Sequence, residues 1–174
     1  TFTTAWRTEK GISAARTGST DVEPIVTATS APKRSFFIPK WYHILMPTLF
    51  SRIMAGEIPC HKIWEDDRFF AFLDIKPIQP GHVLVVPKQE IENAFEMDDE
   101  MYAAFFLAAK RLVPAIREAM GSARVGLVVE GLEVPHAHIK LVPISKPHDL
   151  AQENAKDATP EELAAVADKI RAQL

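Results

Sequence analysis

Apolar residues recur with helical spacing in two long parts of the chain. In residues 98–120 they lie three or four positions apart and the run ends at Gly121, which predicts a helix with one buried face. Pro114 falls inside this run and is expected to kink the helix or remove one hydrogen bond. A final helix is predicted to begin after Thr159, which can cap it, with Pro160 at its first position.

Short β-rich runs, separated by turn residues, occupy much of the remaining chain from residue 47 onward. The predicted strands cover residues 62–64, 68–74, 82–87, 125–129 and 133–144. An acidic turn joins the first two and is typical of a hairpin, and Thr48 can cap a short helix that precedes them. Hairpins with helices inserted between them predict an α+β domain: an antiparallel sheet of about five strands with a long helix and a C-terminal helix.

Residues 133–144 hold the candidate chemistry. His136, His138 and Lys140 alternate with apolar residues, and this two-residue period predicts a strand with all three polar side chains on one face. Neighbours on that face lie roughly 6.5–7 Å apart, so the row can bind a phosphate-sized group. From these residues alone three interpretations stay open: catalysis, a metal site that uses two imidazoles, and packed structural residues.

The composition differs near the start of the chain. Residues 1–40 are rich in Thr, Ser and Ala, include three prolines and show no sustained periodicity. We therefore expect residues 1–45 to be a non-catalytic, flexible N-terminal extension and residues 46–174 to form one domain. The basic residues of the extension are also weakly typical of a transit peptide. A cytoplasmic protein is expected, with an organellar location as the alternative.

Overall composition narrows the range of partners. The chain has 174 residues, of which 47% are hydrophobic, enough for one domain with a substantial core. The formal net charge of −3 gives no basic surface for nucleic acid, and no apolar run approaches the roughly 20 residues that cross a bilayer. Cys60 is the only cysteine, which excludes an internal disulfide and a zinc site built mainly from cysteine. We expect neither a nucleic-acid nor a membrane partner.

Three segments taken together resemble the histidine triad, or HIT, proteins. They are LFSRIMAGEIPCHKIWEDD, FFAFLDIKPIQPGHVLVVPK and VPHAHIKLVP, and the family motif is His-φ-His-φ-His-φ-φ, where φ is apolar. The resemblance implies a HIT-like α+β fold, usually a homodimer, that binds a purine nucleotide. It also implies hydrolysis at the α-phosphate of a nucleoside phosphoramidate or dinucleoside polyphosphate, without a cofactor.

The middle histidine of the motif is the nucleophile in the family, and here it is His138. It attacks the α-phosphorus and forms a nucleotidyl-histidine, which water then hydrolyses. The resemblance implies that the backbone carbonyl of His136 accepts a hydrogen bond from one ring nitrogen of His138, so that the other nitrogen presents its lone pair. A neutral imidazole is nucleophilic near pH 7 because its reference pKa is about 6.5.

Other positions match substrate contacts of the family. Asp74 matches the carboxylate that accepts from both ribose hydroxyls. The residues that match the base pocket are Phe50, Ile53, Phe72 and Ile75. For each of these four, simple core packing is at least as good an interpretation. His82 matches a histidine close to the triad, for which a supporting hydrogen bond is expected. Residues 48–51 (TLFS) occupy a stretch where some relatives carry zinc-binding cysteines. Those cysteines are absent here, so that structural metal is not expected.

Two residues depart from the family pattern. Lys140 stands at the third triad position; it can donate to phosphate, but with a reference pKa near 10.4 it exchanges protons poorly at pH 7. Glu133 would repel an anionic substrate unless it pairs with Lys140, and we expect that pair. Two alternatives to a hydrolase therefore remain. One is a nucleotide-binding module with little turnover because of Lys140, and the other is a metal-dependent hydrolase that uses His136 and His138.

Overall fold

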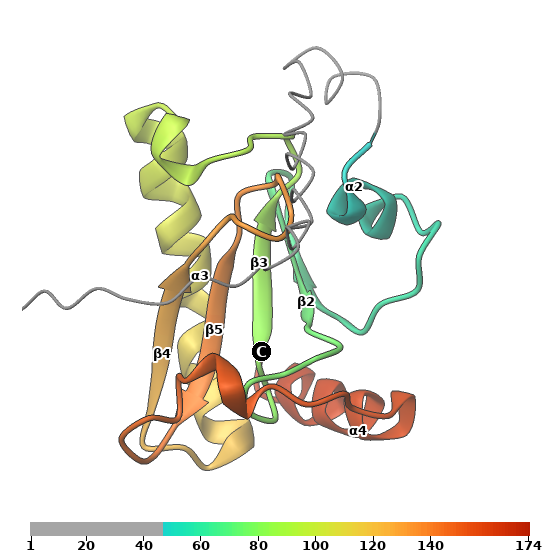
Figure 1. Cartoon of the computed structure of the whole chain (residues 1–174), viewed down its shortest axis with the longest axis vertical. Helices are drawn as coiled ribbons and strands as arrows, with labels where there is room; N and C mark the ends of the chain where they lie inside the picture. The colour runs from blue at the N-terminus through green and yellow to red at the C-terminus, as the bar shows by residue number, and fades with distance from the viewer. Residues whose placement is uncertain (1–46) are drawn as a thin grey trace, which may run out of the picture. The chain divides into compact units, whose positions relative to one another are not determined.

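The computed structural model describes residues 47–174, which form a five-stranded antiparallel sheet with helices packed against it (Figure 1). The strands are β1 (Lys62–Glu65), β2 (Phe69–Leu73), β3 (Val83–Pro87), β4 (Arg124–Val129) and β5 (Ile139–Ile144). The helices are α2 (Leu49–Met54), α3 (Asp99–Met120) and α4 (Pro160–Arg171), with short 3₁₀ turns η1 (Ala94–Glu96) and η2 (Gln152–Asn154). The strand order is β1-β2-β3-β5-β4, and the predicted α+β architecture is confirmed.

Both longer helices begin, and α3 also ends, where the sequence predicts. The Asp98 side chain accepts a hydrogen bond from the Met101 backbone N–H at 2.8 Å, and Gly121 closes α3 in the left-handed conformation. α3 continues through Pro114 to Met120. At the start of α4, the Thr159 side chain and the Glu162 side chain each accept from the other residue's backbone N–H, a reciprocal arrangement that satisfies two donors with no partner inside the helix.

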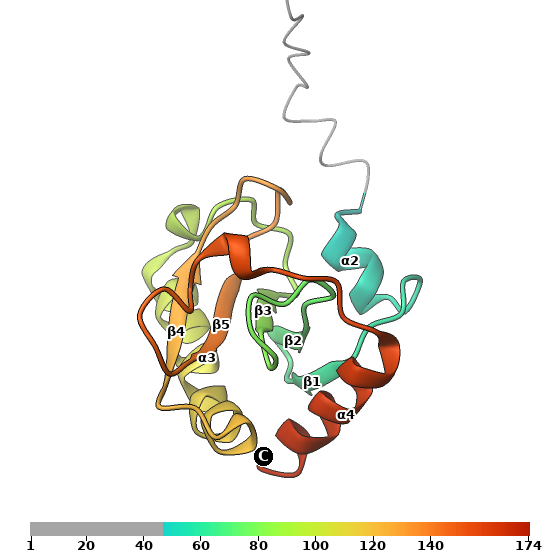
Figure 2. The ribbon, with the colours of Figure 1, turned by 60° about the horizontal axis from the view of Figure 1, so that its bottom comes forward.

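The central strands β2 and β3 are buried on both faces of the sheet, and the candidate site lies on the face away from α3. Alternate residues of β2, such as Phe69 and Ala71, pack with α3 and α4 in the main core. The residues between them, Phe70 and Phe72, pack with Phe50 of α2 and with β3 in a smaller cluster. Figure 2 shows α2 apart from α3 and α4. Every β2 side chain is buried, so the strand reads as continuously apolar although it serves two different layers.

The strand that carries the triad is shorter than predicted. β5 begins at Ile139, so Lys140 lies in the sheet, between Leu84 of β3 and Val128 of β4, whereas His136 and His138 precede it. The His136 backbone N–H donates to the Val134 carbonyl at 2.8 Å, within a turn. The prediction of one strand over residues 133–144 was therefore wrong in its first half, where a local turn replaces the ladder.

The predicted extension, residues 1–45, lies outside the described residues, and its boundary and its non-catalytic role stay predictions. Within residues 47–174, no helix is long and apolar enough to cross a membrane.

Gly81 and Gly56 form a matched pair for testing the loop that leads into His82. Both have positive φ, +88° and +78° respectively, so alanine at either position should cost about 1 kcal/mol in backbone strain. A Cβ at Gly81 would also lie 2.6 Å from Met120 Cγ, whereas a Cβ at Gly56 meets nothing within 4 Å. Urea unfolding should show that Gly81→Ala lowers the free energy of unfolding by at least ~1 kcal/mol more than Gly56→Ala. Equal losses would mean that Met120 moves aside freely.

Candidate active site

His138 is held in one tautomer by a backbone carbonyl. Its Nδ1–H donates to the carbonyl oxygen of His136 at 2.8 Å; a carbonyl only accepts, so the hydrogen must be on Nδ1. In the neutral ring Nε2 is then the unprotonated nitrogen. The side chain is 5% exposed, and Phe50 packs edge-on against its ring at 5.3 Å between centroids. The residue therefore presents a fixed lone pair in a nearly closed environment.

His136 is fully buried and uses both ring nitrogens. Its Nε2–H donates to the Pro87 carbonyl at 2.8 Å, and its Nδ1 lies 2.7 Å from the Thr48 hydroxyl oxygen. Burial lowers the pKa of His136 and of His138, although the hydrogen bond from each ring to a backbone carbonyl partly opposes that effect. Both imidazoles are therefore held in the neutral form.

Lys140 pairs with Glu130, not with Glu133 as predicted. Its Nζ lies 2.9 Å from Glu130 Oε2, and the Lys140 ammonium holds the pKa of the Glu130 carboxyl below its usual range. Glu130 follows directly after β4, which is the neighbour of Lys140 in the sheet, so the register brings the two side chains together. Glu133 lies farther along the connection and lines the same cavity as Lys140 without an ion pair to it. The position of β4 beside β5 therefore determines that Lys140 pairs with Glu130, although Glu133 is closer to Lys140 in the sequence.

A cavity of about 380 Å³ brings together most of the predicted site residues. The predicted residues that line it are Phe50, Ile53, Phe72, Asp74, Ile75, His138 and Lys140. Its walls are largely apolar, with the imidazole, ammonium and carboxylate concentrated in a few places, which is the usual composition of a small-molecule site. Gln152 and Ala155 also line it. They lie beyond the segments that resemble the HIT family, so their place in the cavity could not be predicted from the sequence.

Asp74 lies on the wall of this cavity with its side chain 23% exposed. One carboxylate oxygen, Oδ1, accepts from the Lys76 backbone N–H at 2.8 Å. This bond fixes the carboxylate at the end of β2, with acceptor capacity left for other donors.

His82 does not make the predicted hydrogen bond to the triad. Its Nδ1 accepts from the Ile78 backbone N–H at 3.3 Å, and among the described residues its Nε2 has no hydrogen-bond partner. Burial lowers the pKa of His82 to about 4, against the opposing effect of Asp74. Although Asp74 Oδ2 lies 3.5 Å from Nδ1, the contact is not an ion pair, because that nitrogen already accepts a hydrogen bond. His82 is a neutral, buried neighbour of the site.

Two further cavities adjoin this region. His138 and Glu130 also line one of about 310 Å³. A larger one, of about 860 Å³, lies between the β2–β3 loop and α4 and is lined by Asp74 and His82 but by no triad residue. Size alone would therefore point away from the histidines, whereas the convergence of polar groups points to the 380 Å³ cavity.

In residues 47–174 no cluster of three or more His, Cys, Asp or Glu side chains is arranged to hold a metal ion. Thr48 and Ser51 hydrogen-bond to each other and to the side chains of His136 and Glu90.

Comparisons with known proteins give relatives over most of the described chain. "Protein hit" of Bacillus subtilis is 32% identical over 141 residues, which cover 76% of this chain and 97% of that protein. The crystal structure of a HIT-like protein from Bartonella henselae matches with a TM-score of 0.63 and 30% identity, over 73% of this chain and 96% of that one.

Two relatives carry names that state an activity. "Adenosine 5'-monophosphoramidase hnt1" of Schizosaccharomyces pombe is 39% identical over 71 residues, 41% of this chain and 53% of that protein. "Adenylylsulfatase HINT3" of Arabidopsis thaliana is 33% identical over 100 residues, 55% of this chain and 51% of that protein.

A family model described as "HIT domain" matches residues 55–147, more than half of the chain and all of the residues from β1 to β5. The fold, the position of the histidines beside β5 and these matches agree, and the chain belongs to the HIT family.

Proposed function

We propose that this protein is a hydrolase that acts at the α-phosphate of a purine nucleotide through a nucleotidyl-histidine on His138. The observation that carries the proposal is the 2.8 Å hydrogen bond from His138 Nδ1–H to the His136 carbonyl. It leaves Nε2 as a nucleophile that needs no deprotonation. The activity-bearing names of two relatives, a phosphoramidase and an adenylylsulfatase, support bond breaking next to an adenylyl phosphorus.

In the first step the His138 Nε2 lone pair forms a bond to the α-phosphorus, and the bond from phosphorus to the leaving group breaks. The leaving group departs with that electron pair. In the second step water adds to phosphorus, the N–P bond breaks, and its electrons return to Nε2 while the nucleoside monophosphate and a proton are released. The Lys140 ammonium offsets charge on the phosphoryl oxygens in both steps.

The 380 Å³ cavity is the proposed nucleoside site. Phe50, Ile53, Phe72 and Ile75 supply apolar surface for the base, and we infer that Asp74 accepts from the ribose hydroxyls, since its carboxylate is fixed on the wall of this cavity. Ile75 is 65% exposed, so simple core packing does not explain it. Its exposed apolar surface is available for contact with the base of a bound nucleotide.

The two alternatives differ from the proposal in specific contacts. A binding module with little turnover would keep the cavity but lack proton transfer at Lys140. A metal-dependent hydrolase would need lone pairs on His136 and His138, but three of their four ring nitrogens are already hydrogen-bonded. The hydrogen bonds therefore favour the covalent route over metal binding by this pair.

We also infer that the protein is a homodimer. β4 forms one edge of the sheet, and Leu127 on it and Leu107 on α3 are 43% and 62% exposed. An edge strand with uncovered apolar side chains is a surface that a second copy can cover. Sedimentation of the full chain would check this inference.

His138→Ala should abolish turnover of adenosine 5'-monophosphoramidate and adenylyl sulfate, because it removes the proposed nucleophile. Loss of the nucleophile should lower kcat by several orders of magnitude, whereas a lost binding contact is worth only ~1–3 kcal/mol. AMP binding should persist, and mass spectrometry should detect an adenylyl adduct on the wild type alone.

His148→Asn is the matched control, because His148 is exposed and Asn tolerates its positive φ. It should retain full activity. Near-normal turnover by the His138→Ala variant would show that His138 is not the nucleophile. Loss of wild-type activity in a strong chelator, with recovery on added zinc, would favour the metal-dependent alternative.

The pH dependence should reflect the lowered pKa of His138. Burial is the largest cause of that lowering, and the Lys140 charge adds to it. Because the neutral imidazole is the nucleophile, kcat/KM should stay level from pH 7 down past about 6.5 and decline only at lower pH. Removing the ammonium in Lys140→Met should move this decline to higher pH. A decline centred above pH 6.5 in the wild type would contradict the assignment.

Acid unfolding must be separated from this decline. The buried histidines bind protons more readily in the unfolded chain, so stability falls as pH drops below about 6.5 and, for His82, continues to fall until about pH 4. Circular dichroism at each pH gives the range over which rates report on the folded enzyme.

Lys140 should make the enzyme selective for good leaving groups. A lysine that stays protonated can stabilise charge but cannot cycle a proton to the leaving group. Adenylyl sulfate, whose leaving group needs no proton, should then be hydrolysed better than adenosine 5'-monophosphoramidate. Lys140→His should speed the phosphoramidate most, and Lys140→Met should slow both substrates. Uniform slowing by Lys140→His would mean that lysine serves the reaction in another way.

A further inference from the structure

His136 holds the acceptor for the nucleophile, yet the sheet does not hold His136. It precedes β5, and its backbone N–H is used in a local turn. The residue is fixed instead through its side chain, which hydrogen-bonds at one end to the Pro87 carbonyl and at the other to the Thr48 hydroxyl. Those two partners belong to the end of β3 and the start of α2.

The direction of the Thr48 hydrogen bond follows from the other partners. The Pro87 carbonyl can only accept, so Nε2 of His136 carries the ring hydrogen and Nδ1 of the neutral ring is bare. The Thr48 hydroxyl must therefore donate to Nδ1, across 2.7 Å. The same hydroxyl oxygen accepts from the Ser51 backbone N–H at 3.1 Å, which makes it the N-cap of α2. One hydroxyl thus caps a helix and orients an imidazole.

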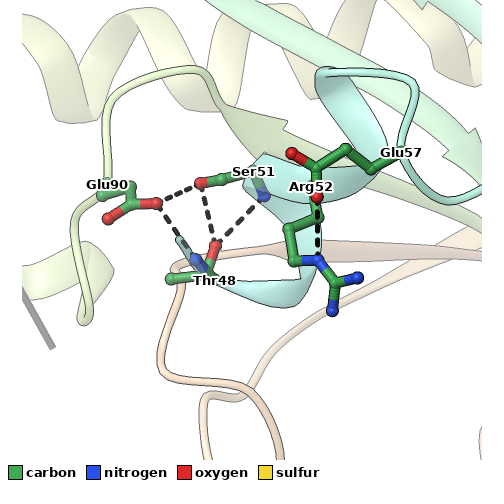
Figure 3. Close-up of polar contacts among 5 residues, drawn as sticks. All are labelled: Thr48, Ser51, Arg52, Glu57 and Glu90. Carbon is green, nitrogen blue, oxygen red and sulfur yellow. Dashed lines mark hydrogen bonds and ion pairs between the residues drawn. The ribbon is translucent and has the colours of Figure 1, made fainter. Parts of the chain in front are cut away.

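Glu90 holds this hydroxyl in place from the other side (Figure 3). Its Oε1 accepts from the Thr48 backbone N–H at 3.1 Å and from the Ser51 hydroxyl in a short contact. Because the carboxylate takes the hydrogen of Ser51, the Thr48 hydroxyl is free to donate to His136. The three side chains at the start of α2 and in the β3–α3 connection therefore act as one hydrogen-bonded unit.

α2 carries part of the nucleoside cavity as well as this unit. Leu49, Phe50 and Ile53 line the cavity, and the Phe50 ring packs edge-on against both His136 and His138, at 5.6 and 5.3 Å between centroids. The start of the helix thus holds the histidine loop while its side chains form one wall of the nucleoside site.

We propose that Thr48 is a positioning residue for the nucleophile: by donating to His136 Nδ1 it fixes the His136 carbonyl against His138 Nδ1–H, and Glu90 positions Thr48 for that task. The inference rests on the proposed role of His138. A displaced carbonyl would allow the His138 ring to turn or change tautomer, which removes the lone pair from the phosphorus while leaving the nucleoside cavity intact.

Three variants and one control test the proposal. Thr48→Val removes the hydroxyl and keeps the side-chain shape, and Thr48→Ser keeps the hydroxyl. Glu90→Ala removes the carboxylate that positions it. Glu57→Ala is the control, because Glu57 is also an exposed carboxylate that contacts α2, through a 3.0 Å pair with Arg52 (Figure 3), but it makes no hydrogen bond to Thr48 and is not one of the residues that line the cavity.

With adenosine 5'-monophosphoramidate, Thr48→Val should lower kcat roughly 10- to 100-fold, the scale of a misplaced reacting group, with KM little changed. Thr48→Ser should restore most of kcat, Glu90→Ala should lower it by less than Thr48→Val, and Glu57→Ala should match the wild type. A hydroxyl that only capped α2 would instead act through the cavity wall and raise KM. An unchanged kcat in Thr48→Val, an effect confined to KM, or a Thr48→Ser variant as impaired as Thr48→Val would overturn the proposal.

Histidine ¹⁵N spectra separate this proposal from the assignment of His138. In the wild type and Thr48→Ser, His136 should have hydrogen on Nε2 only, and that hydrogen should exchange slowly with water. In Thr48→Val it should exchange faster. A wild-type His136 protonated on Nδ1 would overturn the positioning role whatever the activity of His138→Ala. An active His138→Ala variant with the expected spectra would overturn the nucleophile, and the catalytic role of Thr48 with it, but not the hydrogen bond from Thr48 to His136.

Discussion

One hydrogen bond, from His138 Nδ1–H to the His136 carbonyl, decides what the site can do. A neutral imidazole has one lone pair in the ring plane, and a bond of 2.8 Å at one nitrogen commits that lone pair to the other. Burial reinforces the choice by lowering the pKa of the ring, so the nucleophilic form is present without a separate base. The surrounding contacts keep the His136 carbonyl oxygen within hydrogen-bonding distance of the His138 ring.

The sheet supplies rigidity only to part of the triad. Lys140 lies in β5, whose backbone pairs with β3 on one side and with β4 on the other. The backbone position of Lys140 is therefore fixed, and its ammonium group reaches Glu130 at the end of β4. The histidines lie where the chain enters that strand. Side-chain hydrogen bonds fix the position of this loop, as backbone hydrogen bonds fix the position of β5. The loop can therefore hold the His138 ring in one orientation although it is not part of the sheet.

Local pattern was enough to predict much of the fold. The cap at Thr159 and the glycine after α3 lie where the sequence predicts them, because these signals act through neighbours along the chain. The Lys140 partner was missed because the β4–β5 register, which brings Glu130 at the end of β4 beside Lys140, cannot be seen in the local sequence. Thr48 was predicted as a cap, but its contact with a residue 88 positions away leaves no local trace. Roles of individual site residues follow from the family resemblance and from contacts, not from periodicity.

The shortness of α2 has a consequence for how the site opens. Six residues are far fewer than the roughly 12–15 that form a marginally stable helix in isolation, so α2 exists only through its tertiary contacts. Any local unfolding of α2 would therefore uncover one wall of the 380 Å³ cavity and break the Thr48 contact to His136 at the same time. The cover of this cavity and the position of the His136 loop are thus coupled through one short segment.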